Sequence, residues 1–158
     1  VSLWVKCLSP FLRLCGALLP YAGKNIPVQV RFTSDLSSDA IGFNRCFHYP
    51  NRKPYHFHSR LVPNGGDSVI EFMKFGLGWR MRYVYEDGKA QLRHDGYIWR
   101  IGKLDIPLPL VYVLGRGYAD EQAVSDNEFV MYFDIKHPLF GKVFGYKGHF
   151  KLTQSPHA

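Results

Sequence analysis

The chain has 158 residues, which is the length of one domain, and its 46% hydrophobic and 21% charged residues exclude a disordered chain. Aromatic residues make up 16%, which favours β structure because aromatic side chains suit pleated, half-buried surfaces. The formal net charge is +7, with the basic excess in residues 1–104, and it fits either an anionic partner (phospholipid headgroups, nucleic acid, an acidic protein) or an ordinary soluble basic surface.

The apolar segment of residues 2–19 is predicted to be a helix. Its small and polar residues recur at spacings that place them on one narrow stripe: Ser2, Lys6, Ser9, Arg13 and Gly16. Two charges and Pro10 argue against a helix that spans a membrane. Two interpretations stay open. Either the rest of the domain encloses this helix, or the helix lies on an anionic membrane surface with Trp4 and Phe11 inserted.

From residue 28 onward the hydrophobic pattern alternates with a period of two, which is typical of strands. The clearest example is MKFGLGWRMRYVY, residues 73–85, which predicts one long strand that bends at Gly76 and Gly78. Its bulky residues fall on one face: Met73, Phe75, Leu77, Trp79, Met81, Tyr83 and Tyr85.

Turn residues divide the chain into further strands. Asp87-Gly88 predicts a type I′ turn, and Asp95-Gly96 predicts a bulge or turn partway along the return strand, residues 90–101. LDIPLPL, residues 104–110, is predicted to be extended because of its two prolines. Other strands are predicted for VQVRF, IGFNRCFHY, YHFHSRLV, EFVMYFDIK and the stretch that ends near residue 152.

These elements predict one mainly β domain over residues 1–158, with a helix at about 2–19 and about eight strands at about 27–152. Parallel pairing needs long crossover connections, and the short turns here leave no room for them. We therefore expect a curved antiparallel meander sheet, a half-open or closed barrel packed around the N-terminal helix.

The order of four segments resembles a bacterial domain family of unknown function. These segments are NIPVQVRF after the apolar N-terminal helix, YHFHSRL with VIEFMKFGLGWRMRY, IPLPLVYVLG, and FVMYFDIKHPLFGKVFGYKGHFKL. The resemblance runs from about residue 3 to residue 152. It implies a domain that occurs alone or C-terminal to saccharopine-dehydrogenase-like NAD(P)-binding domains, and it supplies no activity and no catalytic residues.

No nucleotide-binding loop is predicted, because the residues that such a loop requires do not occur at the required spacing. A phosphate-binding loop that ended at Gly141-Lys142 would need a glycine where Lys136 stands and a serine or threonine in place of Val143. The stretch GRGYAD, residues 115–120, lacks the third glycine of a dinucleotide site. We therefore predict no cofactor.

Metal and nucleophile sites are weakly indicated. His56 and His58 share one strand face, but a metal would need a third ligand such as His48, His94 or Glu71, and a solvated strand face explains the pair better. Activation of Cys46 is conceivable beside Arg45, although burial is the commoner fate of such a thiol. The three cysteines, Cys7, Cys15 and Cys46, have no disulfide or zinc spacing and predict reduced thiols in a cytoplasmic protein.

Charged residues inside the strands suggest pairing. Glu71 and Asp134 lie in apolar strands, so each either faces solvent or is buried with a basic partner. For Glu71 the candidates are Arg60, Arg80 and Arg82, and such a pair could orient the polar head of a ligand. Lys74 shares a face with Arg80 and Arg82, opposite the aromatic face, and this segregation argues against specific binding of nucleic acid.

The sequence therefore predicts a non-catalytic domain that binds an apolar or amphipathic ligand, such as a lipid, between the curved sheet and the helix. The competing interpretation is that the aromatic residues fill a solid core. The alternative function is an accessory domain that docks an oxidoreductase partner or, from a peripheral position, an anionic membrane surface. Neither catalytic residues nor an oligomeric state can be assigned. The predicted ligand-binding residues are Trp79, Met81, Tyr83, Phe133, Tyr146, Arg60, Glu71 and Arg82.

Overall fold

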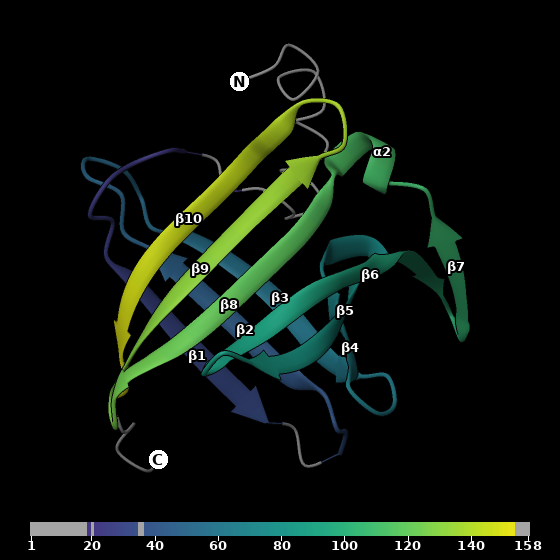
Figure 1. The fold of residues 1–158 in the computed structure, drawn as a ribbon, viewed down its shortest axis with the longest axis horizontal. Coiled ribbons are helices and arrows are strands. Elements are labelled where there is room, and N and C mark those ends of the chain that lie inside the picture. The colour runs from purple at the N-terminus through teal and green to yellow at the C-terminus, as the bar shows by residue number, and fades with distance from the viewer. Residues whose placement is uncertain (1–18, 20, 35–36, 154–158) are drawn as a thin grey trace.

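The computed structural model describes residues 19, 21–34 and 37–153. These residues are mainly β and form one antiparallel sheet that curls into a half-barrel (Figure 1). The elements in chain order are β1 Val28–Ser34, β2 Ile41–Phe47, β3 Tyr55–Pro63, β4 Ser68–Phe72, the 3₁₀ turn η1 Lys74–Gly76, β5 Leu77–Glu86, β6 Lys89–Ile101, β7 Leu104–Leu108, α2 Val111–Leu114, β8 Arg116–Ser125, β9 Glu128–His137 and β10 Gly141–Lys151.

The sheet is a meander with one side branch. Each strand from β1 to β6 pairs with the next one, and the path then continues through β8, β9 and β10. The branch is β7, which pairs with the last part of β6, whereas β8 pairs with residues Ala90 to Arg93 near its start. Within the described residues no pairing joins β1 to β10, so the half-barrel is open along these two edges.

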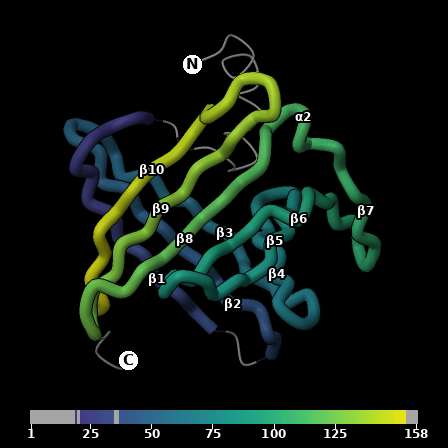
Figure 2. The backbone as a smooth tube through the Cα atoms, in the orientation of Figure 1, coloured from purple at the N-terminus to yellow at the C-terminus, as the bar shows by residue number. Residues whose placement is uncertain are grey.

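Bending brings the two ends of the sheet over one another. In Figures 1 and 2, β8, β9 and β10 cross in front of β1, β2 and β3. One source of the curvature is a bulge in β6, where the register with β5 shifts between Arg80 and Met81. Gly96 lies there with φ 123°, and Arg80 donates hydrogen bonds to the Asp95 carbonyl oxygen at 3.1 and 2.9 Å. The predicted bulge at Asp95-Gly96 is therefore confirmed.

The Asp87-Gly88 turn between β5 and β6 is also confirmed. Asp87 has φ 54° and Gly88 has φ 71°, and positive φ at both central residues is the mark of a type I′ turn. This turn matches the twist of the strands that it joins, so it supports the pairing of β5 with β6 over the whole length of β5.

The prediction of one strand over residues 73–85 is wrong. The chain reverses between β4 and β5 through η1, where Phe75 has φ 60° and Gly76 has φ 76°. A Cβ atom on Gly76 would lie 2.4 Å from the Arg100 carbonyl oxygen, so this close approach requires glycine. The hairpin is closed by a 2.8 Å hydrogen bond from the Met73 amide to the Leu77 carbonyl oxygen. Alternation of bulky residues simply continues across the turn, and this misled the prediction.

Other differences concern the number of elements. Within the described residues the sheet has ten strands instead of about eight, because residues 104–108 pair with β6 and residues 116–125 form the unpredicted strand β8. Pro107 is compatible with β7 because this strand has a partner on one side alone. The short helix α2 was not predicted either. The predicted helix at 2–19 falls, apart from residue 19, outside the described residues, and it stays a prediction.

The buried core lies where β4, β5 and β6 pack against α2, the short helix before β8. It is formed by Val69, Trp79, Met81 and Tyr97, against which Leu92, Leu108, Leu114 and Phe133 pack, among others. Met81 is completely buried, at 0% exposure. The indole of Trp79 lies directly on the backbone of β8, because a Cβ atom at Gly117 would come within 2.4 Å of the Trp79 ring.

We expect Gly117→Ala to lower the free energy of unfolding by about 1–3 kcal/mol, the usual cost of overpacking a core. The added methyl group would displace the Trp79 indole, whereas Gly→Ala in an unstrained strand would normally be favourable. Urea denaturation followed by circular dichroism measures the change. Gln122→Ala, at an exposed position of the same strand, is the matched control, and equal stability of both variants with the wild type would contradict the close contact.

Candidate functional site

The inner face of the half-barrel carries aromatic side chains from both layers. Phe133 of β9 pairs in register with Tyr146 of β10, and their rings stack at 5.2 Å between centroids. Phe133 also meets Trp79 of β5 edge-to-face at 5.7 Å. Phe133 thus contacts two other predicted ligand-binding residues, and Met81 lies beside Trp79 and Phe133 in the core. Offset and edge-to-face pairs at such distances stabilise the packing beyond the area that they bury.

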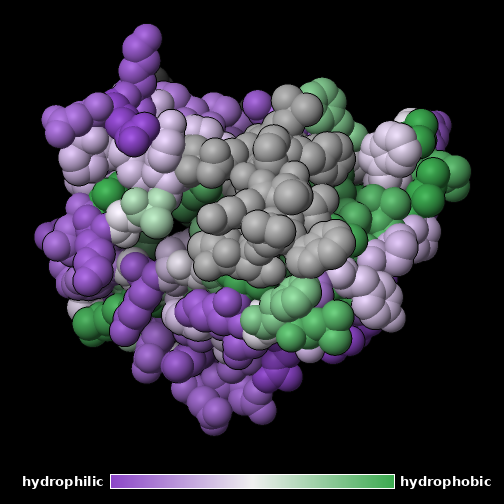
Figure 3. Space-filling model, turned by 90° about the horizontal axis from the view of Figure 1, so that it is seen from above, coloured by the Kyte–Doolittle hydropathy of each residue, from purple (hydrophilic) through white to green (hydrophobic). Residues whose placement is uncertain are grey.

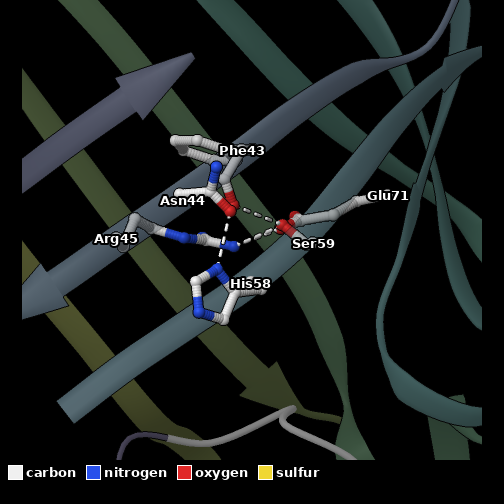
Figure 4. Close-up of polar contacts among 6 residues, drawn as sticks. All are labelled: Phe43, Asn44, Arg45, His58, Ser59 and Glu71. Carbon is white, nitrogen blue, oxygen red and sulfur yellow. Dashed lines mark hydrogen bonds and ion pairs between the residues drawn. The ribbon is translucent and has the colours of Figure 1, made fainter. Parts of the chain in front are cut away.

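A polar cluster interrupts this apolar face, and it ties together β2, β3 and β4 (Figure 4). Nη2 of Arg45 lies 2.5 Å from Oε1 of Glu71 and donates a hydrogen bond to the Ser59 hydroxyl at 2.7 Å. The Ser59 hydroxyl lies 2.6 Å from the same Glu71 oxygen. We call Arg45, Ser59 and Glu71 the inner polar cluster.

The apolar surroundings of Arg45 are unusual for a cation. Its guanidinium carbon lies 4.0 Å from the ring centroid of Phe43 and 4.0 Å from that of Phe57. Cation–π attraction from two rings compensates part of the cost of removing the guanidinium from water. Nε of Arg45 is buried and has no hydrogen-bond partner among the described residues. The cluster therefore retains one free donor on the inner face.

The predicted partners of Glu71 were wrong, because its partner is Arg45. Glu71 pairs in register with Leu61 and Trp79, which places it on the inner face. Arg60, Arg80 and Arg82 alternate with those neighbours and so lie on the outer face, where Arg80 and Arg82 contact the Asp95 carboxylate at 3.1 and 3.5 Å. Lys74 does not extend their row, because it lies in η1.

Three more titratable side chains approach the inner polar cluster. Burial raises the pKa of Tyr146 to about 12, Glu71 and Glu121 add to this rise, and Arg45 opposes it. Burial, followed by Glu121 and Glu71, also raises the pKa of Tyr83. Desolvation raises the pKa of Glu121. The inner face therefore favours neutral, protonated forms of these groups.

Sequence reasoning missed Arg45, Ser59 and Glu121. The signal for Arg45 was present in IGFNRCF, where Arg45 shares the strand face of Phe43 and Phe47. An arginine in phase with aromatic residues needs an inward partner, and Glu71 was the available carboxylate. Glu121 gave no comparable signal, because the strand that carries it was not predicted.

Asp134, the other carboxylate in an apolar strand, lies on the opposite face of the sheet. It is almost fully buried and accepts a hydrogen bond from the Tyr132 hydroxyl at 2.7 Å. Nζ of Lys142 donates to the same hydroxyl at 3.0 Å, and its side chain crosses over Gly145, where a Cβ atom would clash with it. Asp134 is therefore paired through a tyrosine and, at 3.6 Å, with Lys136.

Two shallow pockets lie outside the inner polar cluster. One, of about 510 Å³, is lined by residues 21–24 and 26 and by Tyr49, Pro50 and Arg52. The other, of about 340 Å³, lies beside the β6 bulge and includes His94 and Arg116. Nε1 of Trp79 donates to Nδ1 of His94 at 2.9 Å, and burial together with Arg116 lowers the pKa of this histidine. The hydrogen bond requires an unprotonated Nδ1, in keeping with the lowered pKa.

The remaining residues that the sequence suggested as metal ligands or nucleophiles lie away from the inner polar cluster. His56 and His58 stack at 6.0 Å on the outer face, and His58 Nδ1 lies 2.7 Å from the Asn44 side-chain oxygen. No three His, Cys, Asp or Glu side chains are grouped to hold a metal ion in the described part of the chain. The Cys46 thiol is free, and it lies 3.5 Å from His48 Nε2. No helix among the described residues is long and apolar enough to cross a membrane.

Comparison with known proteins gives one match. The family model described as Domain of unknown function (DUF4166) matches residues 2–150. No curated protein and no solved structure matches the chain significantly.

The inner polar cluster predicts a characteristic double-mutant result. Arg45→Met leaves the buried Glu71 carboxylate without its cation, and we expect it to lower the free energy of unfolding by about 3–5 kcal/mol. Arg45→Met/Glu71→Met removes both charges and should recover most of this loss. Arg82→Met on the outer face is the control. Urea denaturation measures the free energy of unfolding of each variant. Additive losses of stability in the double variant would contradict a coupled pair.

Glu121 predicts a pH dependence. Because its pKa is raised in the folded protein, it contributes stability at low pH, and that stability is lost as the pH rises through the raised pKa. Glu121→Gln should therefore raise the thermal midpoint at neutral pH and change it little below the ordinary glutamate range. Asp126→Asn, in the exposed β8–β9 turn, is the control. A shift of equal size at both pH values would contradict the desolvation of Glu121.

Proposed function

The chain belongs to the family described as Domain of unknown function (DUF4166), and within this family we propose that it is a non-catalytic domain that binds an apolar or amphipathic ligand on the inner face of its half-barrel. One observation carries the proposal. Aromatic side chains of the inner face lie beside the inner polar cluster, in which Arg45 Nε has no hydrogen-bond partner among the described residues. Ligand sites in proteins typically combine apolar walls with a few fixed polar groups.

The charge of the cluster favours an uncharged ligand head. Arg45 and Glu71 neutralise each other, so the site has no cation left to bind a carboxylate. Glu71 and Glu121 would repel a second anion, as they already raise the pKa of the Tyr146 hydroxyl. A hydroxyl or ester oxygen suits the free Arg45 Nε and the protonated Tyr146 better. We therefore infer a long-chain alcohol or an ester-linked lipid as the ligand class.

A ligand would enter the inner face from one end of the half-barrel. Tyr83 and Tyr85 continue the inner row of β5 toward the β5–β6 turn, and their exposures are 47% and 80%. Phe32 of β1 stacks on Phe43 at 4.8 Å and is 59% exposed. We call this end, together with Ala123 of β8, the mouth. Exposed aromatic residues that lead to buried ones suit the entry of an apolar chain.

The resemblance noted from the sequence supports a second, weaker proposal. The resemblance implies bacterial relatives that occur next to saccharopine-dehydrogenase-like domains, and from it we infer a cytoplasmic accessory domain that serves such an oxidoreductase. In that setting the half-barrel would hold an apolar group while the partner supplies the chemistry. Ligand binding by the isolated domain is the first step to test.

A blocking variant tests ligand binding. Ala123→Trp places an indole at the mouth, and we expect it to reduce binding of a pyrene-labelled long-chain alcohol at least about tenfold, the effect of losing about 1.4 kcal/mol. Gln122→Trp places the same side chain on the opposite face of β8 and should bind like the wild type. Fluorescence titration measures both affinities.

The preference for an uncharged ligand head group is tested with the same fluorescence titration. The alcohol should bind more tightly than the fatty acid of equal length, and Arg45→Met/Glu71→Met should weaken that preference. Mass spectrometry of gently purified protein identifies any retained lipid. A wild type that neither binds the probe nor carries a lipid would show that the aromatic residues simply fill a core.

A further inference from the structure

One end of the molecule presents four exposed apolar side chains from two separate segments. Tyr112 and Val113 lie in α2, and Leu139 and Phe140 form the turn between β9 and β10. Leu139 is 81% exposed, Tyr112 73% and Phe140 48%. We call these four residues the apolar tip. Its two segments lie together at the upper end of the molecule in Figure 1.

His137 fixes the geometry of the apolar tip. Its Nε2 lies 2.8 Å from the Tyr112 carbonyl oxygen, and its Nδ1 accepts a hydrogen bond from the Leu139 amide at 3.1 Å. The imidazole is buried and stacks on Phe140 at 4.7 Å. These contacts hold α2 against the turn, so the exposed side chains are presented by a defined structure.

Cations lie just below the apolar tip, where the buried Asp134 carboxylate contacts Lys136 at 3.6 Å. Arg116 and Lys142 both pair in register with Lys136, which places three cations on adjacent strands just below the turn. Residues 135–153 contain four lysines and no aspartate or glutamate. Figure 3, which views the molecule from above this end, shows separate patches of hydrophobic side chains next to hydrophilic ones.

We propose that the apolar tip docks the protein onto an anionic lipid bilayer. Leu139 and Phe140 would enter the boundary between headgroups and acyl chains, and Tyr112 would lie at headgroup level, where aromatic side chains are enriched. Arg116, Lys136 and Lys142 would face anionic headgroups, whose attraction falls off within a Debye length. The proposal does not rest on ligand binding in the half-barrel.

A bilayer fits these features better than a protein or nucleic acid. Four side chains at a turn and a single helical turn offer far less area than the roughly 800 Å² per partner of a standard protein interface. The cations would bind a nucleic acid, but a nucleic acid would not bury the exposed Leu139 side chain. An anionic bilayer uses both the apolar side chains and the positive charge.

Vesicle flotation tests the proposal with the full chain. Wild type should float with vesicles of phosphatidylcholine and phosphatidylserine, and much less with phosphatidylcholine alone. Leu139→Ser/Phe140→Ser should lower the bound fraction at least about tenfold, because two buried side chains are lost. Phe75→Ser/Leu104→Ser, at equally exposed positions away from the tip, should float like the wild type.

Charge variants complete the test. Arg116→Gln/Lys142→Gln should weaken flotation and its dependence on salt, whereas Lys147→Gln/Lys151→Gln on the outer face of β10 should have a smaller effect. Thermal melting confirms that each variant is folded. The proposal is overturned if wild type does not float, or if tip variants float normally while Lys6→Glu/Arg13→Glu abolishes binding. It is also overturned if the tip mediates self-association without binding vesicles.

Discussion

The buried contact between Arg45 and Glu71 determines how the first half of the sheet is arranged. It spans from β2 to β4 across β3, where Ser59 completes the hydrogen bonding. A slip of one residue in any of these strands would turn one charged group outward and leave the other buried alone, at a cost of several kcal/mol. An apolar pair would stabilise the interior as well, but it would tolerate such a slip. The pair therefore specifies register more than it adds stability.

The second half of the sheet reaches this cluster because the sheet bends. The bulge at Asp95-Gly96 and the absence of a side chain at Gly117 let β8 approach Trp79, and β9 and β10 then lie across β1 to β3. This approach brings Tyr146 next to Arg45 and Glu71, which lie 101 and 75 positions earlier in the chain. Desolvation of Tyr146 is therefore a consequence of the curvature and not of any single strand.

Sequence patterns predicted what depends on local periodicity and failed where tertiary contacts decide. Alternation predicted the β class and put Trp79, Met81, Tyr83, Phe133 and Tyr146 on one side of their strands, as the register shows. It could not locate the hairpin at Phe75-Gly76, because that turn depends on the close approach of the Arg100 carbonyl oxygen. Nor could it pair Glu71 with Arg45, because strand pairing selects this arginine. The gathering of Tyr112 with Leu139 depends on His137, whose two ring contacts no local pattern reveals.

The β9–β10 hairpin connects the two proposed surfaces and also keeps them apart. Its turn carries Leu139 and Phe140, its middle carries Phe133 and Tyr146, and its far end lies near the mouth. Ten residues of extended strand separate the turn from the far end, about 30 Å. Tyr146, which lies beside the inner polar cluster, is five residues after Gly141, about 17 Å along the strand. This also exceeds the Debye length at physiological salt, so headgroups at the tip have little influence on the charges of the cluster. A bilayer at the apolar tip would leave the mouth facing water, where a soluble partner can deliver or remove a ligand.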